Sequence, residues 1–296
     1  MKIDGVFSGG GVKAYAFIGA LESIAEKNLE FERVAGTSAG SILASFIAAG
    51  YNGDEIKRLL DELNLEEFLD PPSLTKIIPG SKWFFLYYQM GLYKGDKFER
   101  WIYYQLAKKR IYTFGDLKEG YLKVIVSDLT LGKLVVIPDD LERIYGISPN
   151  DFPIARAVRM SAGFPYFFMP KKLTGISKEK SLIVDGGLLS NFPLWVFESD
   201  TNKRTRPILG LKLSDSPQHT SPKKIKNALD MLHALFSTMK QAHDARYIAK
   251  SQKESIIFIP VKDVHTTDFK IDNNVKEKLI NNGRDVANNF LRYWST

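Results

Sequence analysis

The chain has 296 residues, of which 44% are hydrophobic, a formal net charge of +7 and no cysteine. This length suits one large α/β domain or two small ones, and because neither a flexible linker nor an internal repeat divides the sequence, we expect one domain over residues 1–296. The lack of cysteine excludes disulfides and thiol catalysis, and the scattered basic residues, which form no nucleic-acid motif, argue against a nucleic-acid partner.

A glycine run follows the first predicted strand. The apolar residues Ile3–Phe7 predict the strand, and Ser8-Gly9-Gly10-Gly11 leads into a helix predicted over about Val12–Lys27. Glycines after a strand allow backbone N–H groups to point into a cavity, which is an arrangement suited to an anion. The oxyanion of a serine hydrolase is one such anion, and Lys13 would help to bind it.

The same glycines also fit a dinucleotide-binding site. Gly9-x-Gly11-x-x-Ala14 after a strand matches one form of the dinucleotide fingerprint, and Glu30 or Glu32 lies near the position of the ribose-binding carboxylate. These residues alone do not separate the two interpretations, so the choice depends on motifs elsewhere in the chain.

The next predicted element is a serine on a tight turn. Phe31–Ala35 predicts a short strand, Gly36-Thr37-Ser38-Ala39-Gly40 forms the turn, and the apolar, Ala-rich residues 41–49 predict a buried helix. A strand, a sharp turn and a helix are the context in which G-x-S-x-G holds a nucleophile, here Ser38. The helix dipole would favour the developing negative charge, and the amide of Ala39 would be one oxyanion donor. The alternative is a glycine turn that only packs or binds phosphate.

Residues 65–110 are interpreted as an insertion that covers the site. Within it, the run Trp83–Tyr93 is unusually aromatic. Such a run suits a buried core, but Trp and Tyr also suit the headgroup region of a bilayer, and our hypothesis is a lid or an acyl-chain pocket. A second aromatic run beside lysines, Phe164–Lys172, is a candidate for the mouth of the site.

A carboxylate follows a strand late in the chain. Ser181–Val184 predicts an inner strand, which Asp185-Gly186-Gly187 ends. The end of an inner strand is the usual place for an active-site group in an α/β sheet, and the two glycines let the loop pass close to the carboxylate. An aspartate that only accepts hydrogen bonds from its own turn is the alternative.

Histidine, the usual general base of serine hydrolases, has no obvious candidate. The four histidines are His219, His233, His243 and His265. None follows a predicted strand or a glycine turn, and two of them lie in a long helix predicted from about Lys223 to Lys250. A dyad of Ser38 and Asp185 is therefore favoured, with desolvation raising the pKa of the aspartate above its reference value of about 3.9. A triad that includes His265 or His219 is the alternative.

Strand-like runs recur along the chain, with helical patterns between many of them. The runs are Ile3–Phe7, Phe31–Ala35, Leu122–Val126, Leu134–Ile137, Leu182–Val184, Ile208–Leu213 and Ile256–Val261. This alternation predicts a layered α/β sheet. Among the helices, Asp54 is the expected N-cap of one that follows the serine turn.

Three motifs, in this order, resemble the patatin-like phospholipase family. They are Ser8-Gly9-Gly10-Gly11-Val12-Lys13-Ala14, Gly36-Thr37-Ser38-Ala39-Gly40 and Asp185-Gly186-Gly187, with weaker matches at Val126–Gly132, Arg156–Pro165 and Asn191–Pro193. The resemblance covers roughly residues 1 to 215, and residues 216–296 are a less typical C-terminal extension of helix and strand. Lys13 departs from the arginine that the family often has, and Ala14 from the glycine of many members.

The resemblance implies an α/β/α sandwich with a mostly parallel central sheet, and a serine hydrolase that cleaves fatty-acyl esters of lipids or phospholipids. Ser38 would be the nucleophile, Asp185 would activate it, and the amides of Gly9, Gly10 and Gly11 with that of Ala39 would hold the oxyanion. A phospholipase A-type ester hydrolase of this kind forms an acyl-enzyme and needs no metal or organic cofactor.

Several other functions stay open at this point. A lysophospholipase, a thioesterase or an acyltransferase would use the same dyad, because the acceptor is chosen by the shape of the pocket. Outside these enzymes, the alternatives are a dinucleotide-binding protein and a catalytically idle module that binds lipid.

The N-terminal sequence and the charge bear on location. The sequence begins Met1-Lys2-Ile3-Asp4 without the pattern of a signal peptide, and no apolar run approaches the length that spans a bilayer. We therefore expect a cytoplasmic protein. Because the net positive charge would attract anionic lipid headgroups, we also expect peripheral contact with a membrane surface.

Overall fold

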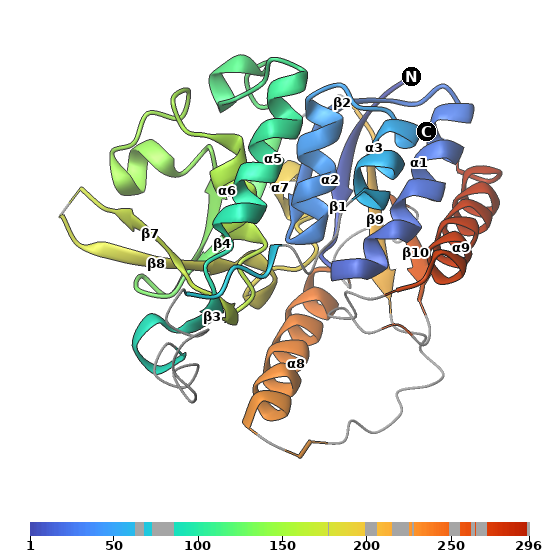
Figure 1. The fold of residues 1–296 in the computed structure, drawn as a ribbon. Helices are drawn as coiled ribbons and strands as arrows, with labels where there is room; N and C mark the ends of the chain where they lie inside the picture. Colours follow the sequence, from blue (N-terminus) through green and yellow to red (C-terminus); the bar gives the residue numbers. More distant parts are fainter. Residues whose placement is uncertain are drawn as a thin grey trace.

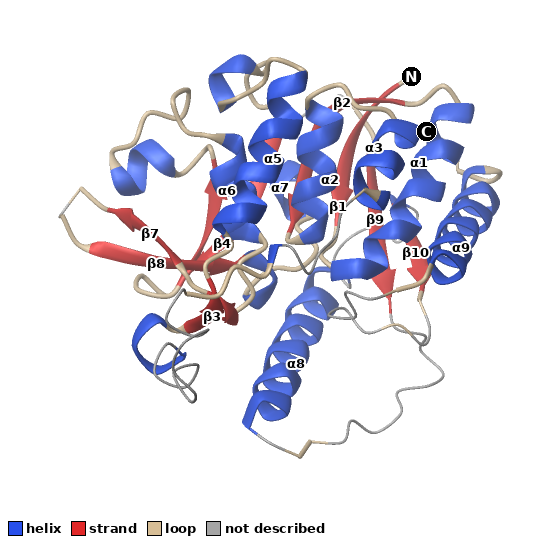
Figure 2. Ribbon diagram, in the orientation of Figure 1, coloured by secondary structure: helices blue, strands red, loops and turns tan. Residues whose placement is uncertain are grey.

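The computed structural model shows a central sheet with helices on both faces (Figure 1). It describes residues 1–62, 68–72, 86–176, 178–198, 206–214, 225–226, 228–248, 255–261, 264 and 271–294. Figure 2 distinguishes the strands from the helices that cover them. This is the mixed α/β architecture that the sequence predicts.

The strands in the described part of the chain are labelled β1 to β10. They are β1 (Lys2–Phe7), β2 (Glu30–Thr37), β3 (Gly91–Tyr93), β4 (Leu122–Asp128), β5 (Lys133–Ile137), β6 (Tyr166–Phe168), β7 (Lys171–Thr174), β8 (Lys180–Asp185), β9 (Ile208–Ser214) and β10 (Ile256–Pro260). The α-helices are α1 (Tyr15–Glu26), α2 (Ala39–Ala48), α3 (Gly53–Asp61), α5 (Asp96–Lys108), α6 (Ile154–Ser161), α7 (Trp195–Glu198), α8 (Ala228–Ile248) and α9 (Asn273–Leu291). Short helical turns include η1 (Gly11–Ala14), η4 (Phe114–Asp116), η5 (Leu141–Tyr145) and η6 (Gly186–Leu188).

The main sheet is parallel in one half and antiparallel in the other. Its order is β10-β9-β1-β2-β4-β8-β7, with β5 also paired to β4. The strands from β10 to β4 run parallel, while β5 and β8 are antiparallel to β4 and β7 is antiparallel to β8. A small second sheet joins β3 and β6. The parallel half gathers the carboxyl ends of its strands at one edge, where α/β proteins place their sites.

Two strands meet end to end on one edge of β4. β5 occupies the opposite edge over Val124–Asp128. β2 pairs in parallel as far as Thr37 opposite Ile125, and β8 pairs antiparallel with Asp185 opposite Val126. Because β2 and β8 run toward each other along the same edge, the residue after Thr37 arrives beside Asp185.

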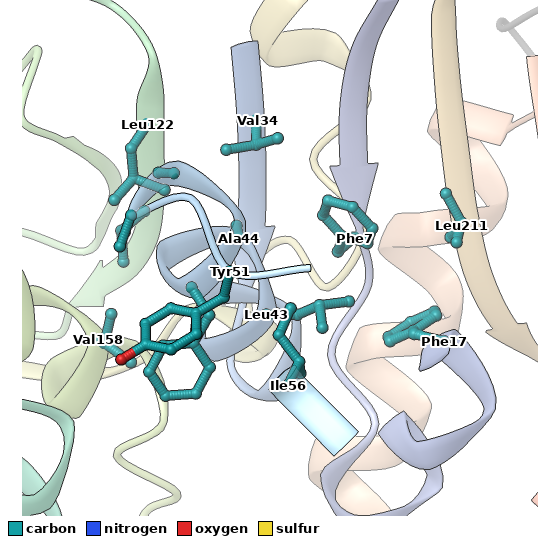
Figure 3. Packing of buried hydrophobic residues seen from close by; sticks show 14 of the residues in the cluster. Phe7, Phe17, Val34, Leu43, Ala44, Tyr51, Ile56, Leu122, Val158 and Leu211 are labelled. Atoms are coloured by element: carbon teal, nitrogen blue, oxygen red, sulfur yellow. The ribbon is translucent and has the colours of Figure 1, made fainter. Parts of the chain in front are cut away.

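The sheet buries apolar side chains on both faces. Phe7 and Val34 point into the larger cluster, with α1 and α2, where the Phe7 and Phe17 rings lie 6.0 Å apart (Figure 3). The neighbouring Val6 and Ala35 point into the second cluster, on the side of α7. A buried side chain of this size stabilises a fold by about 1.5–3 kcal/mol. Burial on both faces therefore fixes the ends of β1 and β2, which carry the two glycine motifs.

The elements predicted from the sequence are largely confirmed. The seven predicted strands are present as β1, β2, β4, β5, β8, β9 and β10. The short strands β3, β6 and β7 were not predicted, because three or four residues show little periodicity. The prediction for Asp54 is wrong: Asn52 is the N-cap of α3, where its side chain accepts from the Glu55 amide and the Glu55 carboxylate accepts from the Asn52 amide.

The C-terminal helix α9 packs on α1 at two glycines. A Cβ added to Gly283 would overlap the Ala16 carbonyl oxygen, and one added to Gly19 would overlap the Ile280 carbonyl oxygen. The backbones of the two helices can approach this closely only because both positions lack a side chain. The contact fastens the end of the described chain to its first helix.

Gly283→Ala should therefore lower the free energy of unfolding, although alanine is the better helix former by about 1 kcal/mol. Overpacking of this kind costs typically about 1–3 kcal/mol. Urea unfolding monitored by circular dichroism measures the change. Gly53→Ala in α3 is the matched control, because its new Cβ meets no atom closer than 3.7 Å. A stabilised Gly283→Ala variant would contradict the close packing of α1 and α9.

Candidate active site

Ser38 occupies a strained turn between β2 and α2. Its φ of 53° and ψ of −124° are unusual for a residue with a side chain, and such a conformation costs about 1–3 kcal/mol. A Cβ on Gly36 would overlap the Gly40 carbonyl, and one on Gly40 would overlap the Phe7 carbonyl. The glycines thus let the turn close tightly against the end of β1, as predicted for a nucleophile turn.

The Ser38 hydroxyl donates a hydrogen bond to Asp185. The distance from Ser38 Oγ to Asp185 Oδ2 is 2.7 Å, and the Gly187 amide donates to Asp185 Oδ1 at 2.7 Å. Asp185 is 3% exposed. Burial raises the pKa of its carboxyl from 3.8 to about 6, opposed by the hydrogen bonds from Ser38 and Gly187 and by the charge of Lys240. Residues 147 positions apart in the chain thus form one hydrogen-bonded pair.

Ser161 ties the serine turn to the sheet. It lies at the end of α6 and is fully buried. Its hydroxyl donates to the Ile125 carbonyl at 2.6 Å and accepts from the Ser38 amide at 2.9 Å. One side chain therefore connects the strained turn to the residue of β4 at which β2 ends. Ser161 was not predicted as a site residue, although it lies within a stretch that resembles the family.

The glycine loop lies against Ser38. A Cβ on Gly9 would stand 3.1 Å from the Ser38 Cβ. The Gly9 amide donates to the Asn191 carbonyl at 3.0 Å, so its hydrogen is already bonded. Gly10 has a φ of 178° and a ψ of 6°, and Gly11 has a φ of 57°, which is readily adopted by glycine. Gly10 and Gly11 are therefore the better candidates for oxyanion donors in this loop.

The dinucleotide interpretation does not fit the geometry. Glu30 and Glu32 lie at the amino end of β2, whereas the glycine loop is at the carboxyl end of β1. The two strands are parallel, so these groups are at opposite edges of the sheet. Glu32 instead forms ion pairs with Lys2 and Lys118. Neither glutamate can serve as the ribose-binding carboxylate of this loop.

The structure does not describe the side chain of any of the four histidines. His219 and His265 lie outside the described residues, and the side chains of His233 and His243 in α8 are not among those described. The dyad of Ser38 and Asp185 is thus the arrangement that the described residues bring together.

Part of the predicted insertion belongs to the core. Residues 63–67 and 73–85, which include the start of the aromatic run, lie outside the described residues. Helix α5 buries Phe98, Ile102 and Leu106 in the main cluster, so the lid hypothesis does not extend to this helix. In the described end of the aromatic run, Tyr87 and Tyr88 are exposed, which does not fit a buried core at those two positions.

Helix α8 contributes a face to the site that sequence reasoning missed. The Phe236 ring lies 4.7 Å from the Phe164 ring. Asp244 accepts from the Phe192 amide at 3.1 Å and forms an ion pair with Lys212 of β9. Positions 236, 240 and 244 are spaced four residues apart and therefore lie on one face of the helix. No local sequence pattern indicates what that face contacts.

Comparisons with known proteins identify the family of the chain. A model of the patatin-like phospholipase family matches residues 5–198. The protein YqhO of Bacillus subtilis (strain 168) is 48% identical over 295 residues, covering 100% of each chain. A probable lipid hydrolase, 463L, of Invertebrate iridescent virus 6 is 24% identical over 209 residues, covering 68% of this chain and 65% of the viral protein.

Solved structures share the fold. VipD from Legionella pneumophila has a TM-score of 0.59 at 18% identity, covering 99% of this chain and 67% of that of VipD. ExoU from Pseudomonas aeruginosa, in its heterodimeric complex with SpcU, has a TM-score of 0.52 at 17% identity, covering 98% of this chain and 51% of the other. The family model spans more than half of the sequence and its three motifs converge in space, so the chain belongs to the patatin-like phospholipase family.

Proposed function

We propose that this protein is a phospholipase A-type acyl hydrolase in which Ser38 and Asp185 form the catalytic dyad. The family and the viral relative support lipid hydrolase activity. The observation that carries the finer proposal is the 2.7 Å hydrogen bond from a strained Ser38 to a buried Asp185. A nucleophile bonded to a base of raised pKa is the arrangement that acyl transfer requires.

The dyad acts in two steps. Asp185 Oδ2 takes the proton of the Ser38 hydroxyl while Oγ bonds to the ester carbonyl carbon, and the amides of Gly10, Gly11 and Ala39 stabilise the oxyanion. When the intermediate collapses, the leaving alcohol takes the proton from Asp185 and the acyl group stays on Ser38. Water, deprotonated by the same carboxylate, then attacks the acyl carbon, and Asp185 returns the proton to Ser38 Oγ as the bond to the serine breaks and the fatty acid leaves. Each oxyanion donor is worth about a hundred- to thousand-fold in rate.

The substrate class follows from the family and from the surface near the site. Within the described residues, no helix has both the length and the apolar character needed to cross a membrane. Exposed apolar side chains, however, recur every four residues along α8, at Met231, Leu235 and Met239. We propose that this stripe, hereafter the α8 apolar stripe, contacts the surface of a membrane that supplies the lipid. Lysophospholipid and thioester substrates, and acyl transfer to an alcohol, are alternatives for the same dyad.

Ser38→Ala should abolish labelling by a fluorophosphonate and reduce ester hydrolysis by at least about a thousandfold. Intact-mass analysis of the wild type should show one adduct that the variant lacks. Ser41→Ala is the matched control, because Ser41 lies in the first turn of α2 and donates to the Ser38 carbonyl rather than to Asp185. A wild type that binds vesicles but shows neither adduct nor turnover would instead indicate an idle lipid-binding module.

The pH dependence should report on Asp185. The carboxylate is the base and its pKa is raised to about 6, so kcat/KM should rise as the pH increases through about 6 and then level off. Asp185→Asn should lower kcat by about a hundred- to ten-thousand-fold and remove this rise. A pH profile unchanged in Asp185→Asn would exclude Asp185 as the base.

Membrane contact predicts that the protein binds anionic vesicles more tightly than neutral ones, with binding that weakens as salt increases. Replacing Met231, Leu235 and Met239 together by serine should weaken binding about tenfold or more, since it removes apolar area that would enter the lipid. Sedimentation with liposomes measures both effects. Tyr293→Ser is the control, because Tyr293 is exposed but lies beyond α9. Equal binding by the stripe variant would rule out the α8 apolar stripe as the contact.

A further inference from the structure

The buried loop Ser190–Phe192 bonds to two of the motifs that converge at the candidate site. Thr37, the residue before the nucleophile, donates from its Oγ1 to the Ser190 carbonyl at 3.1 Å. The Gly9 amide donates to the Asn191 carbonyl at 3.0 Å. This one loop therefore holds both the end of β2 and the glycine loop that follows β1.

The side chain of Asn191 lies between the two glycine motifs. Its Oδ1 would lie 2.5 Å from a Cβ on Gly9 and 3.3 Å from a Cβ on Gly187. The same Cβ on Gly9 would lie 3.1 Å from the Ser38 Cβ, and that on Gly187 would lie 3.0 Å from Asp185 Oδ1. Because neither glycine has a side chain, the Asn191 amide packs against the glycine loop and beside the dyad at the same time.

Asp244 of α8 holds the Asn191 amide in this orientation. Asn191 Nδ2 donates to Asp244 Oδ2 at 3.4 Å, and the Phe192 amide donates to Asp244 Oδ1 at 3.1 Å. Asp244 is itself buried and forms an ion pair with Lys212 of β9. Since Nδ2 faces the carboxylate, Oδ1 faces the glycines. A continuous set of contacts thus runs from α8, which lies below the sheet in Figure 1, through Asn191 to the glycine loop.

We propose that Asn191 is a positioning residue of the site: held by Asp244, it sets the place of the glycine loop and so of the oxyanion donors. This inference rests on the proposed function and deepens it. The loop is held at the Gly9 amide, and Gly10 and Gly11 supply the donors directly after it. An oxyanion donor acts only at the correct distance, and a misplacement of about 1 Å can cost about a hundredfold in rate.

The first experiment measures hydrolysis of a soluble p-nitrophenyl ester. Asn191→Ala should lower kcat about 10- to 100-fold and leave KM within about twofold, because oxyanion donors act on the transition state. Asp244→Ala should act in the same direction, and Asp244→Asn should lose less, because its Oδ1 can still accept from the Phe192 amide. Thr238→Ala is the matched control, since Thr238 is exposed and bonds within α8 to the Ala234 carbonyl. An unchanged kcat in Asn191→Ala would overturn the proposal.

A trifluoromethyl ketone inhibitor gives a readout that a purely structural role would not move. Ser38 Oγ adds to the ketone carbon, Asp185 takes the hydroxyl proton, and the resulting oxyanion needs the glycine-loop donors. The inhibition constant should rise in Asn191→Ala by about the factor by which kcat/KM falls. The corresponding secondary alcohol, which forms no adduct, should bind both proteins equally. An unchanged inhibition constant, with activity lost only in proportion to unfolded protein, would mean that Asn191 supports the fold alone.

Hydrogen exchange separates this proposal from the hydrolase proposal, because it needs no turnover. In the full chain, peptides that contain Gly9 should exchange faster in Asn191→Ala and in Asp244→Ala than in the wild type, while Thr238→Ala should match the wild type. If the wild type hydrolyses no ester, faster exchange in both variants still supports the positioning of the loop, and only the hydrolase proposal fails. Unchanged exchange at Gly9, or an equal rise throughout the sheet, would overturn the role of Asn191.

Discussion

The meeting of β2 and β8 on one edge of β4 is the constraint on which the candidate site depends. The backbone ladder places Thr37 opposite Ile125 and Asp185 opposite Val126, two adjacent positions of one strand. The separation of Ser38 and Asp185 is therefore set by sheet register, not by the conformation of a long loop. A slip of β8 by one residue would turn Asp185 to the other face of the sheet. Ser161 also holds Ser38 at this position, because its hydroxyl bonds to both the Ile125 carbonyl and the Ser38 amide.

In the proposed mechanism an aspartate takes the place of histidine, and burial and hydrogen bonding act on its pKa in opposite directions. Burial raises the pKa of Asp185, and a base must lose its proton before it can accept one. The hydrogen bonds from Ser38 and Gly187 and the charge of Lys240 oppose burial and leave the pKa at about 6. That value lies close to neutrality, where a general base is most effective. Gly187 also lowers the pKa of Asp185, because its backbone amide donates a hydrogen bond to the carboxylate.

The sequence predicted the parts of the fold and site that have local signals. Ser38 and Asp185 each follow an apolar strand and stand beside glycines, so motif and context agreed, and the long strands were predicted from their apolar runs. The role of Ser161 depends on α6 crossing the end of β2, which no local pattern indicates. The bonded amide of Gly9 depends on Asn191, which is distant in sequence. Lys240 is one of many lysines in the sequence, and only the placement of α8 gives it a carboxylate to face.

The family model covers both residues of the proposed dyad but does not cover helix α8. The family model ends at residue 198, before α8 begins at Ala228. The proposed dyad thus lies in the matched part, while the α8 apolar stripe lies outside it. Because α8 carries the apolar stripe and, one residue further round the helix, the face with Phe236, a helix lying in the membrane surface would hold the candidate site next to the lipid. Membrane contact would then be a property of this one helix, which also places the charge of Lys240 where it acts on Asp185.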